Sequence, residues 1–196
     1  MSDPLHDPKP LIRKISCWAL SRYAQWMVWR KDAAAYMEPL VAGLLTRMQD
    51  SNKQVQEAAT SAFAVLEEEA TDQLAPFLDE ILTAFVDCLG RFQVRNRRIL
   101  FDAIGTLAEN VGPEFARDSY FQGLMEPLLD RWLRIDIDDV SLYPLMECLG
   151  SVAKGFGPIF TEAVPHIFPR ACHLVNEVLE AYDGVDEDVR RGRCCG

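Results

Sequence analysis

The sequence repeats itself at intervals of a little over forty residues, and this repetition constrains the fold more than any other feature. Four segments share one pattern of apolar and small residues: ISCWALSRYA (15–24), EAATSAFAVLEE (57–68), RILFDAIGTLAEN (98–110) and YPLMECLGSVAKG (143–155). Aligning Leu20, Phe63, Ile104 and Leu149 gives spacings of 43, 41 and 45 residues. The residues on either side of each anchor are small, and the residue three positions later is apolar (Tyr23, Leu66, Leu107 and Val152). Small residues at fixed positions let neighbouring helices approach closely, so we expect these segments to stack.

A second set of segments lies between and after the first: YMEPLVAGLL (36–45), QLAPFLDEILTAF (73–85), LMEPLLDRWL (124–133) and AVPHIFPRACHLV (163–175). Each contains a proline followed by apolar residues at helical spacing (Pro39, Pro76, Pro127 and Pro165). Proline is tolerated in the first turn of a helix, where its missing N–H has no partner. These prolines therefore predict helix starts. Pro169 falls inside its segment and predicts a kink or restart there.

Both sets place apolar residues at i, i+3, i+4 and i+7, and no stretch alternates like a half-buried strand. The chain is expected to be all-α, with helices at about 9–29, 36–49, 53–70, 73–91, 95–111, 119–134, 140–155 and 159–181. Turn residues such as Asp50-Ser51-Asn52, Gly112-Pro113 and Gly157-Pro158 separate the helices. Paired helices at a period of about 40–47 residues predict a HEAT-repeat superhelical solenoid of about eight antiparallel helices.

The expected domain organisation is a single HEAT-repeat array over residues 9–181. It contains a lone helix, three helix pairs and a second lone helix (9–29; 36–70, 73–111 and 119–155; 159–181). Residues 1–8 are expected to form a disordered tail, and the polar residues 182–196 a frayed one. Both ends of the array would expose a stacking face without a polar capping repeat. The chain is therefore expected to be a piece of a longer array or a truncated gene product.

The acidic composition narrows the possible partners. The 196 residues carry a net charge of −10, which disfavours phosphate backbones and favours basic ligands, so we expect no nucleic-acid partner. The N-terminus lacks the apolar core of a secretory signal, and no apolar run reaches the length that spans a bilayer, so no membrane insertion is expected. Cys17, Cys88, Cys148 and Cys172 lie in apolar segments and are expected to be reduced core residues. Cys194 and Cys195 receive no role.

Register between the repeats predicts a column of surface residues on the helices of the first set. Aligned positions carry Trp18, Ser61, Asp102 and Glu147, and seven residues later Gln25, Glu68, Glu109 and Lys154. Glu57 lies close to the same column, eleven residues before Glu68. Carboxylates accept charge-assisted hydrogen bonds from Arg and Lys, and an exposed indole can pack on a cation. The column is therefore suited to an extended basic peptide.

A simpler interpretation has to be set beside this one, because acidic residues on a helix usually form only a solvated face. Trp26, Trp29 and Trp132 are expected to be core residues. Trp18 differs because its aligned positions hold polar or acidic residues, which do not suit a buried position. Ile15 and Arg22 flank it on its face of the helix.

Several segments closely resemble the transportins, the karyopherin-beta-2 type of nuclear import receptor in the importin-beta superfamily. They are ISCWALSRYAQW (15–26), DSNKQVQEAATSAFAVLEEEA (50–70) and ILFDAIGTLAENVG (99–112), with YPLMECLGSVA (143–153) matching more weakly. The resemblance covers roughly residues 11–180 and corresponds to the central part of a much longer superhelix. It implies a nuclear import receptor fragment that binds basic proline–tyrosine nuclear localisation signals on an acidic concave face. It also implies shuttling between cytoplasm and nucleus.

The resemblance also assigns residues and partners. The family's cargo-contacting positions fall on Ile15, Trp18, Arg22, Glu57, Glu68, Asp102 and Thr106, and the register column adds Glu109 and Glu147. Nucleoporins and the GTPase Ran are partners of the full-length family. The Ran-binding repeats, the acidic loop that couples Ran to cargo release and a second tryptophan-bearing cargo site have no counterpart here. A family threonine contact falls on Val65, and residues 1–10 and 184–196 do not match.

Enzyme chemistry is not expected. His166 and His173 lie seven residues apart without a cysteine or carboxylate at metal-binding spacing, and no phosphate loop or hydrolase motif is present, so neither a metal nor a cofactor is expected. The run at 67–69 is interpreted as a solvated charge run rather than a catalytic pair. Arg98 could pair with Asp102 one turn later. The alternative function is a generic HEAT-repeat interaction scaffold without transport activity.

Overall fold

The computed structural model describes the backbone of residues 3–30 and 32–192, and side chains up to residue 179. Within these ranges the chain forms helices and no strands. The α-helices are α1 (Pro10–Val28), α2 (Ala34–Met48), α3 (Lys53–Glu69), α4 (Thr71–Leu74), α5 (Leu78–Arg91), α6 (Val94–Val111), α7 (Asp118–Arg134), α8 (Leu142–Phe156) and α9 (Val164–Gly192). Short 3₁₀ helices occupy Pro4–His6, Ala75–Phe77, Gly112–Glu114 and Gly157–Glu162. The all-α prediction is confirmed.

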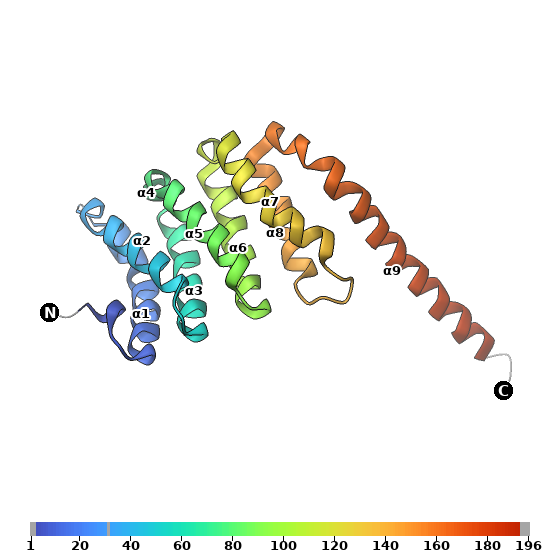
Figure 1. The fold of residues 1–196 in the computed structure, drawn as a ribbon, viewed down its shortest axis with the longest axis horizontal. Helices are drawn as coiled ribbons and strands as arrows, with labels where there is room; N and C mark the ends of the chain where they lie inside the picture. Colours follow the sequence, from blue (N-terminus) through green and yellow to red (C-terminus); the bar gives the residue numbers. More distant parts are fainter. Residues whose placement is uncertain (1–2, 31, 193–196) are drawn as a thin grey trace.

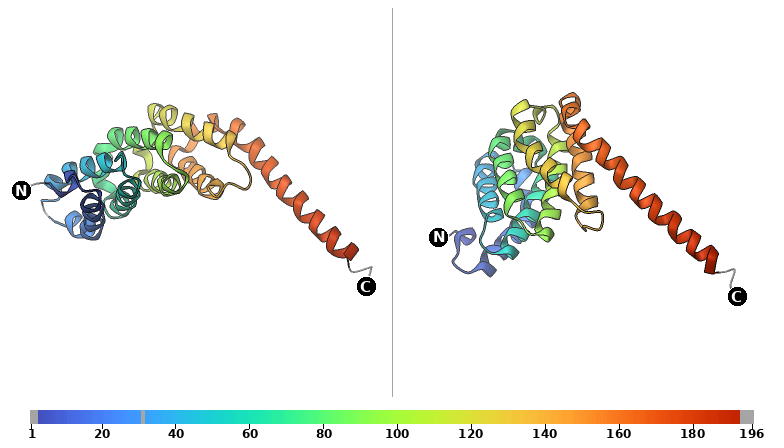
Figure 2. Two further views of the ribbon diagram at one scale, coloured as in Figure 1. Left: turned by 60° about the horizontal axis from the view of Figure 1, so that its bottom comes forward. Right: turned by 45° about the vertical axis from the view of Figure 1, so that its right-hand side comes forward.

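The helices form two rows along the array (Figure 1). The four helices from the repeated segments, α1, α3, α6 and α8, pack successively against one another, while α2, α5 and α7 form the second row. The array bends, and the first row lies along the inner side of the bend in the left view of Figure 2. We call α1, α3, α6 and α8 the inner row and α2, α5 and α7 the outer row. This is the arrangement of a HEAT-repeat solenoid.

Turn chemistry fixes several helix boundaries. The side chain of Asn52 accepts hydrogen bonds from the backbone N–H groups of Gln54 and Val55, which caps the start of α3. Gly112 and Gly157 follow α6 and α8 with φ of +63° and +55°. Few residues other than glycine adopt these angles, so each Gly-Pro pair ends its helix sharply. The turns predicted from sequence at these places are confirmed.

The prediction that proline marks helix starts is only partly correct. Pro165 lies in the first turn of α9, and Pro76 lies in the 3₁₀ segment before α5. Pro39 and Pro127, however, lie inside α2 and α7. The helix extends toward the N-terminus past each of them because the apolar residues there continue the buried face. Helix α9 also runs continuously through Pro169, so no restart occurs there.

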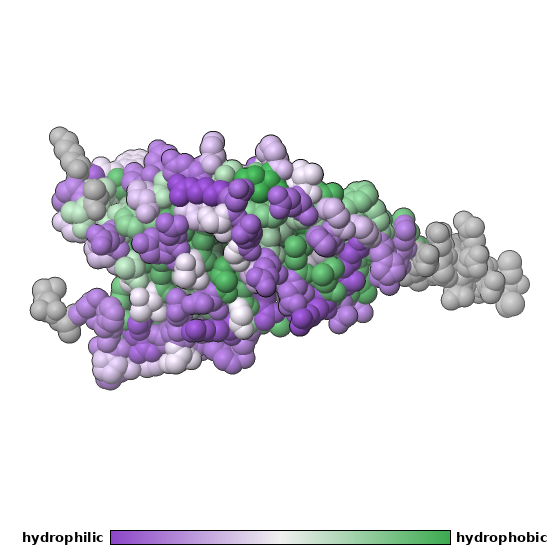
Figure 3. Space-filling view, turned by 45° about the horizontal axis from the view of Figure 1, so that its top comes forward, coloured by the Kyte–Doolittle hydropathy of each residue, from purple (hydrophilic) through white to green (hydrophobic). Residues whose placement is uncertain are grey.

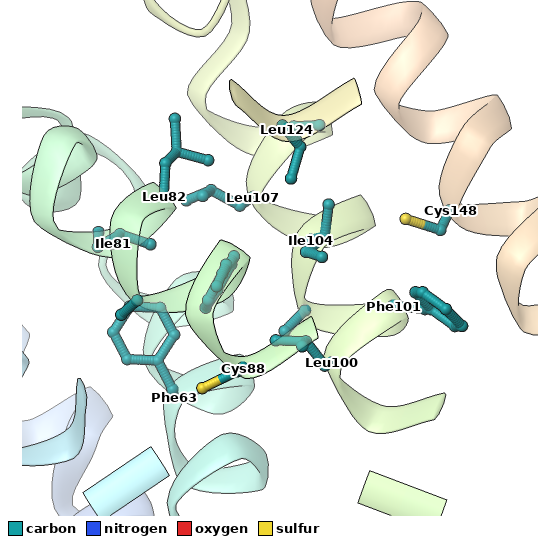
Figure 4. Packing of buried hydrophobic residues seen from close by; sticks show 14 of the residues in the cluster. Phe63, Ile81, Leu82, Cys88, Leu100, Phe101, Ile104, Leu107, Leu124 and Cys148 are labelled. Carbon is teal, nitrogen blue, oxygen red and sulfur yellow. The ribbon is translucent and has the colours of Figure 1, made fainter. Parts of the chain in front are cut away.

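The core fills the space between the two rows (Figure 4). Phe63 of α3 packs edge to face on Phe85 of α5, with ring centroids 5.7 Å apart. Leu100, Ile104 and Leu107 of α6 meet outer-row residues from α5 and α7. Burial of these side chains stabilises the array by roughly 1.5–3 kcal/mol each. The aligned anchor positions Phe63, Ile104 and Leu149 are all buried, as the register predicts.

The two ends of the chain depart from the expected tails. Leu5 is buried in a 3₁₀ turn, and Arg13 donates hydrogen bonds to the carbonyls of Asp7 and Pro8, which ties residues expected to be disordered onto α1. At the other end, α9 continues to Gly192, past the expected end near residue 181. Cys194 and Cys195 lie outside the described residues.

Figure 3 shows one face on which hydrophobic residues form a band between hydrophilic ones.

Two tryptophans expected inside lie at the surface. Trp26 and Trp29 are exposed, Trp29 by 77%, because none of the described helices packs on the outward side of α1. Trp132, in contrast, is 1% exposed, as predicted.

The cysteine prediction holds for Cys17, Cys88 and Cys148, which are buried and free. Cys172 is also free but exposed on α9, where it does not contribute to the core. No described helix combines the length and the apolar character that crossing a bilayer requires.

Candidate peptide-binding surface

The indole of Trp18 is exposed at one end of the inner row. It is 60% accessible, and the guanidinium of Arg22 lies 5.9 Å from its ring centroid, one turn further along α1. Ile15, one turn before it, is also exposed. The three residues therefore form an exposed surface that is apolar and carries one cation. The exposure of Trp18 is what the repeat register predicts.

Helix α3 contributes the next two predicted residues in different states. Glu57 accepts a hydrogen bond from Arg95 of α6 at 2.8 Å, so its charge is already paired within the chain. Glu68 is exposed, and no cation pairs with it among the described residues. Of these two acids, Glu68 is the one free to receive a basic ligand.

A groove between α6 and α8 brings together the remaining predicted residues. Its volume is about 260 Å³, and its lining includes Asp102, Thr106, Glu109 and Glu147. Asp102, Thr106 and Glu109 lie on α6, whereas Glu147 lies on α8, 45 residues after Asp102, so the stacking of the two repeats brings it to the other three. The groove is open to solvent and lined mainly by polar groups, which suits a polar side chain better than an apolar one.

Glu109 differs from the other acids of the groove because it is neutralised by α8. Its carboxylate accepts hydrogen bonds from Ser151 at 2.7 Å and Lys154 at 2.8 Å, and these bonds lower the pKa of Glu109. Asp102 and Glu147 lack such partners among the described residues, and the expected pair between Arg98 and Asp102 does not form there. Of the acids predicted for this surface, Glu68, Asp102 and Glu147 are therefore the ones without a cationic partner among the described residues.

Sequence reasoning did not predict the burial of one acidic residue of α3. Glu67 was expected in a solvated charge run, but it is 1% exposed and both carboxyl oxygens lack hydrogen-bond partners. Burial is the main cause that raises its pKa well above the ordinary value, and Asp102 and Glu68 raise it further. The signal was present in the repeat register: the equivalent positions hold alanine (Ala24, Ala108 and Ala153).

Two other observations on the described residues bear on metal binding and on ligand binding. No group of three or more potential metal-binding side chains gathers among them. A larger cavity of about 850 Å³ lies between α2 and α5. There Asp50 accepts hydrogen bonds from Arg13 and Arg47 at 2.8–2.9 Å, which joins the two rows. None of the predicted site residues lines that cavity.

Stacked antiparallel helix pairs define the molecule as a HEAT-repeat solenoid. No protein-family model matches the chain. Curated relatives nevertheless match nearly all of it. It is 46% identical over 175 residues to human Transportin-1, covering 89% of this chain and 19% of the relative. It is 43% identical over 194 residues to mouse Transportin-1 and 42% over 188 residues to a Dictyostelium discoideum Transportin.

Over the length that it spans, the chain is therefore a homologue of the transportins, the importin beta-2 type of karyopherin. It spans about one fifth of the length of these relatives.

Solved structures agree on the fold. Kap121p bound to Pho4p superposes with a TM-score of 0.75 at 22% identity, over 89% of this chain and 17% of that one. Kap121p bound to Nup53p gives a TM-score of 0.73 at 22% identity, over 91% and 17%. At this identity the likeness concerns the HEAT-repeat arrangement alone.

Proposed function

We propose that the chain is a cargo-binding part of a nuclear import receptor that holds an extended basic peptide along its inner row. The observation that carries the proposal is the combination of an exposed indole, Trp18, with uncompensated carboxylates on the helices that follow. Trp18 and the three carboxylates come from four helices that share one register. Such a surface would contact a peptide in extended form, since a compact partner would reach fewer of the helices.

The expected ligand is a basic proline–tyrosine nuclear localisation signal, as the family resemblance implies. Guanidinium and ammonium groups of the peptide would pair with Glu68, Asp102 and Glu147, and an apolar side chain would pack on Trp18 and Ile15. Thr106 can add a hydrogen bond within the α6–α8 groove. Because Glu57 and Glu109 are already paired, they would contribute by exchanging Arg95 and Lys154 for a group of the peptide.

In the full-length family, this binding belongs to import of proteins from cytoplasm to nucleus, with nucleoporins and Ran as further partners. The Kap121p structures, in which a solenoid of similar fold is bound to Pho4p or to Nup53p, support a protein partner of this general kind.

Fluorescence anisotropy of a labelled basic proline–tyrosine peptide tests the proposal at low salt. Trp18→Ala and Asp102→Lys should each weaken binding by about 1–3 kcal/mol if these residues are binding hot spots, and added salt should weaken it further. Tyr36→Ala and Glu38→Lys make equivalent changes on the exposed surface of α2, outside the inner row, and should bind like the parent chain. If the parent chain fails to bind, or if the two inner-row variants bind as it does, the proposal is wrong.

The generic scaffold is the second candidate function. It is favoured by the pairing of Glu57 with Arg95 and of Glu109 with Lys154, which is what a solvated structural face would show. A scaffold of this kind would have no preference for basic peptides. An acidic peptide of the same length in the same assay therefore separates the two candidate functions.

A further inference from the structure

The buried acid Glu67 occupies a position where the other repeats have a small residue. Its equivalents on the inner row are Ala24, Ala108 and Ala153. Ala24 and Ala108 are buried, and Ala108 lies against Gly155 of the next helix in the row. Glu67 therefore places a carboxyl group in the seam between α3 and α6, where the repeat needs only a methyl group.

The seam satisfies the backbone of Glu67 but not its side chain. Its carbonyl oxygen accepts hydrogen bonds from Asn110 of α6 at 3.3 Å and from Thr71 of α4 at 3.1 Å. Both carboxyl oxygens are shielded from solvent and have no partner. A buried ionised carboxylate without a partner is costly, because it loses its hydration and gains nothing in return.

The charged groups near this carboxyl are both acidic. Asp102 of α6 and Glu68 of α3 act on it, and no described group of α1 or α2 does. Asn96 and Asn110 of α6, which bond to α3, are uncharged, and the α6 cation on this face, Arg95, is paired with Glu57. Asp72, the single titratable residue of α4, is exposed. Burial and these two negative charges together favour the neutral acid, which raises the pKa of Glu67.

We propose that Glu67 is a proton-linked positioning residue for the proposed peptide site: it holds a proton in the free chain and releases it when a cationic side chain binds at Glu68 and Asp102. This inference rests on the proposed function. The physical step is that the incoming cation compensates the two charges that add to the effect of burial in opposing ionisation of Glu67. The O–H bond of the acid then breaks, its electron pair stays on the carboxylate, and the proton passes to buffer. The new carboxylate adds to the attraction for the cation.

Isothermal titration calorimetry tests this, with an end-blocked peptide that contains arginine, lysine, proline and tyrosine but no histidine or acidic residue. Titrations at one pH in two buffers with different ionisation enthalpies give the number of protons released per peptide bound. Parent chain, Glu67→Gln and Glu67→Ala are compared. The glutamine is nearly isosteric, and the alanine restores the residue that the other repeats carry, so at least one variant should fold.

The parent chain should release up to one proton per peptide, and both variants should release less while still binding. Since affinity follows proton release, the affinity of the parent chain should rise by up to tenfold per pH unit relative to either variant. Equal proton counts in parent and variants would overturn the role of Glu67 and leave the proposed function standing. If titration of the parent chain gives no binding heat, both the role of Glu67 and the proposed function are overturned.

Discussion

Two glycines of α8 provide a direct test of the packing between repeats. A Cβ atom added to Gly155 would lie 2.7 Å from the backbone oxygen of Ala108, 3.0 Å from its Cβ and 3.1 Å from Cδ1 of Phe115. The nearest of these atoms is backbone, which cannot move aside without shifting α6. Gly150, on the same helix, has no atom within 4 Å of the added Cβ. The pair therefore separates helix propensity from contact between helices.

For Gly150→Ala we expect stabilisation of up to about 1 kcal/mol, because alanine is the better helix former and the space is open. For Gly155→Ala the overpacking cost is about 1–3 kcal/mol. The propensity gain is smaller at the end of the helix. The two variants should thus differ by roughly 1–3 kcal/mol in free energy of unfolding.

Urea unfolding followed by far-UV circular dichroism measures this difference, with equal slopes required for the comparison. The reasoning is refuted if Gly155→Ala is as stable as Gly150→Ala. That result would mean that α8 is not held against α6 at the distance described here.

Three further predictions concern buried polar groups. The raised pKa of Glu67 means that its penalty is absent below the ordinary glutamate pKa and grows as pH rises toward the raised value, by about 1.4 kcal/mol per pH unit. In thermal melts, Glu67→Gln should therefore gain stability over the parent as pH rises above the ordinary glutamate pKa, and a constant gap would contradict this. Asp50 has a lowered pKa, so its stabilisation is present above the ordinary aspartate pKa and disappears as pH falls through the lowered value. Asp50→Ala should cost about 3 kcal/mol at pH 7 in urea unfolding by leaving Arg13 and Arg47 unpaired, whereas an unchanged midpoint would show the pair to be unimportant. Trp132 is buried with its indole N–H unpartnered, so Trp132→Phe should cost clearly less than the about 3–5 kcal/mol expected for Trp132→Ala, and equal costs would show that the N–H is satisfied.

The repeat register predicted the fold and much of the surface because stacking imposes the same environment at equivalent positions. It identified Trp18 as exposed from the polar residues at aligned positions, and it placed Asp102 and Glu147 on one column. The same comparison would have identified Glu67 as an acid at a position where the other repeats have alanine. Local composition alone, three glutamates in a row, suggested solvent instead.

The errors arose where the environment depends on neighbours that no local pattern reports. Trp26 and Trp29 are apolar enough for a core, but no helix of the described part of the chain packs on the outward side of α1. The pairing of Glu57 with Arg95 joins residues 38 positions apart across two helices, and it depends on side-chain conformations rather than spacing. Pro127 lies within a helix that the apolar pattern carries past it.

Each inner-row helix makes its main contacts with the helices directly before and after it. A small tilt at one junction would therefore be passed along the row and add to the next, so we expect the curvature of the array to adjust at low cost. A change in curvature would alter the distances between the side chains that contact a ligand spanning several helices. Peptides that differ in length between their basic and aromatic residues could then be accommodated by the same side chains at slightly different degrees of winding.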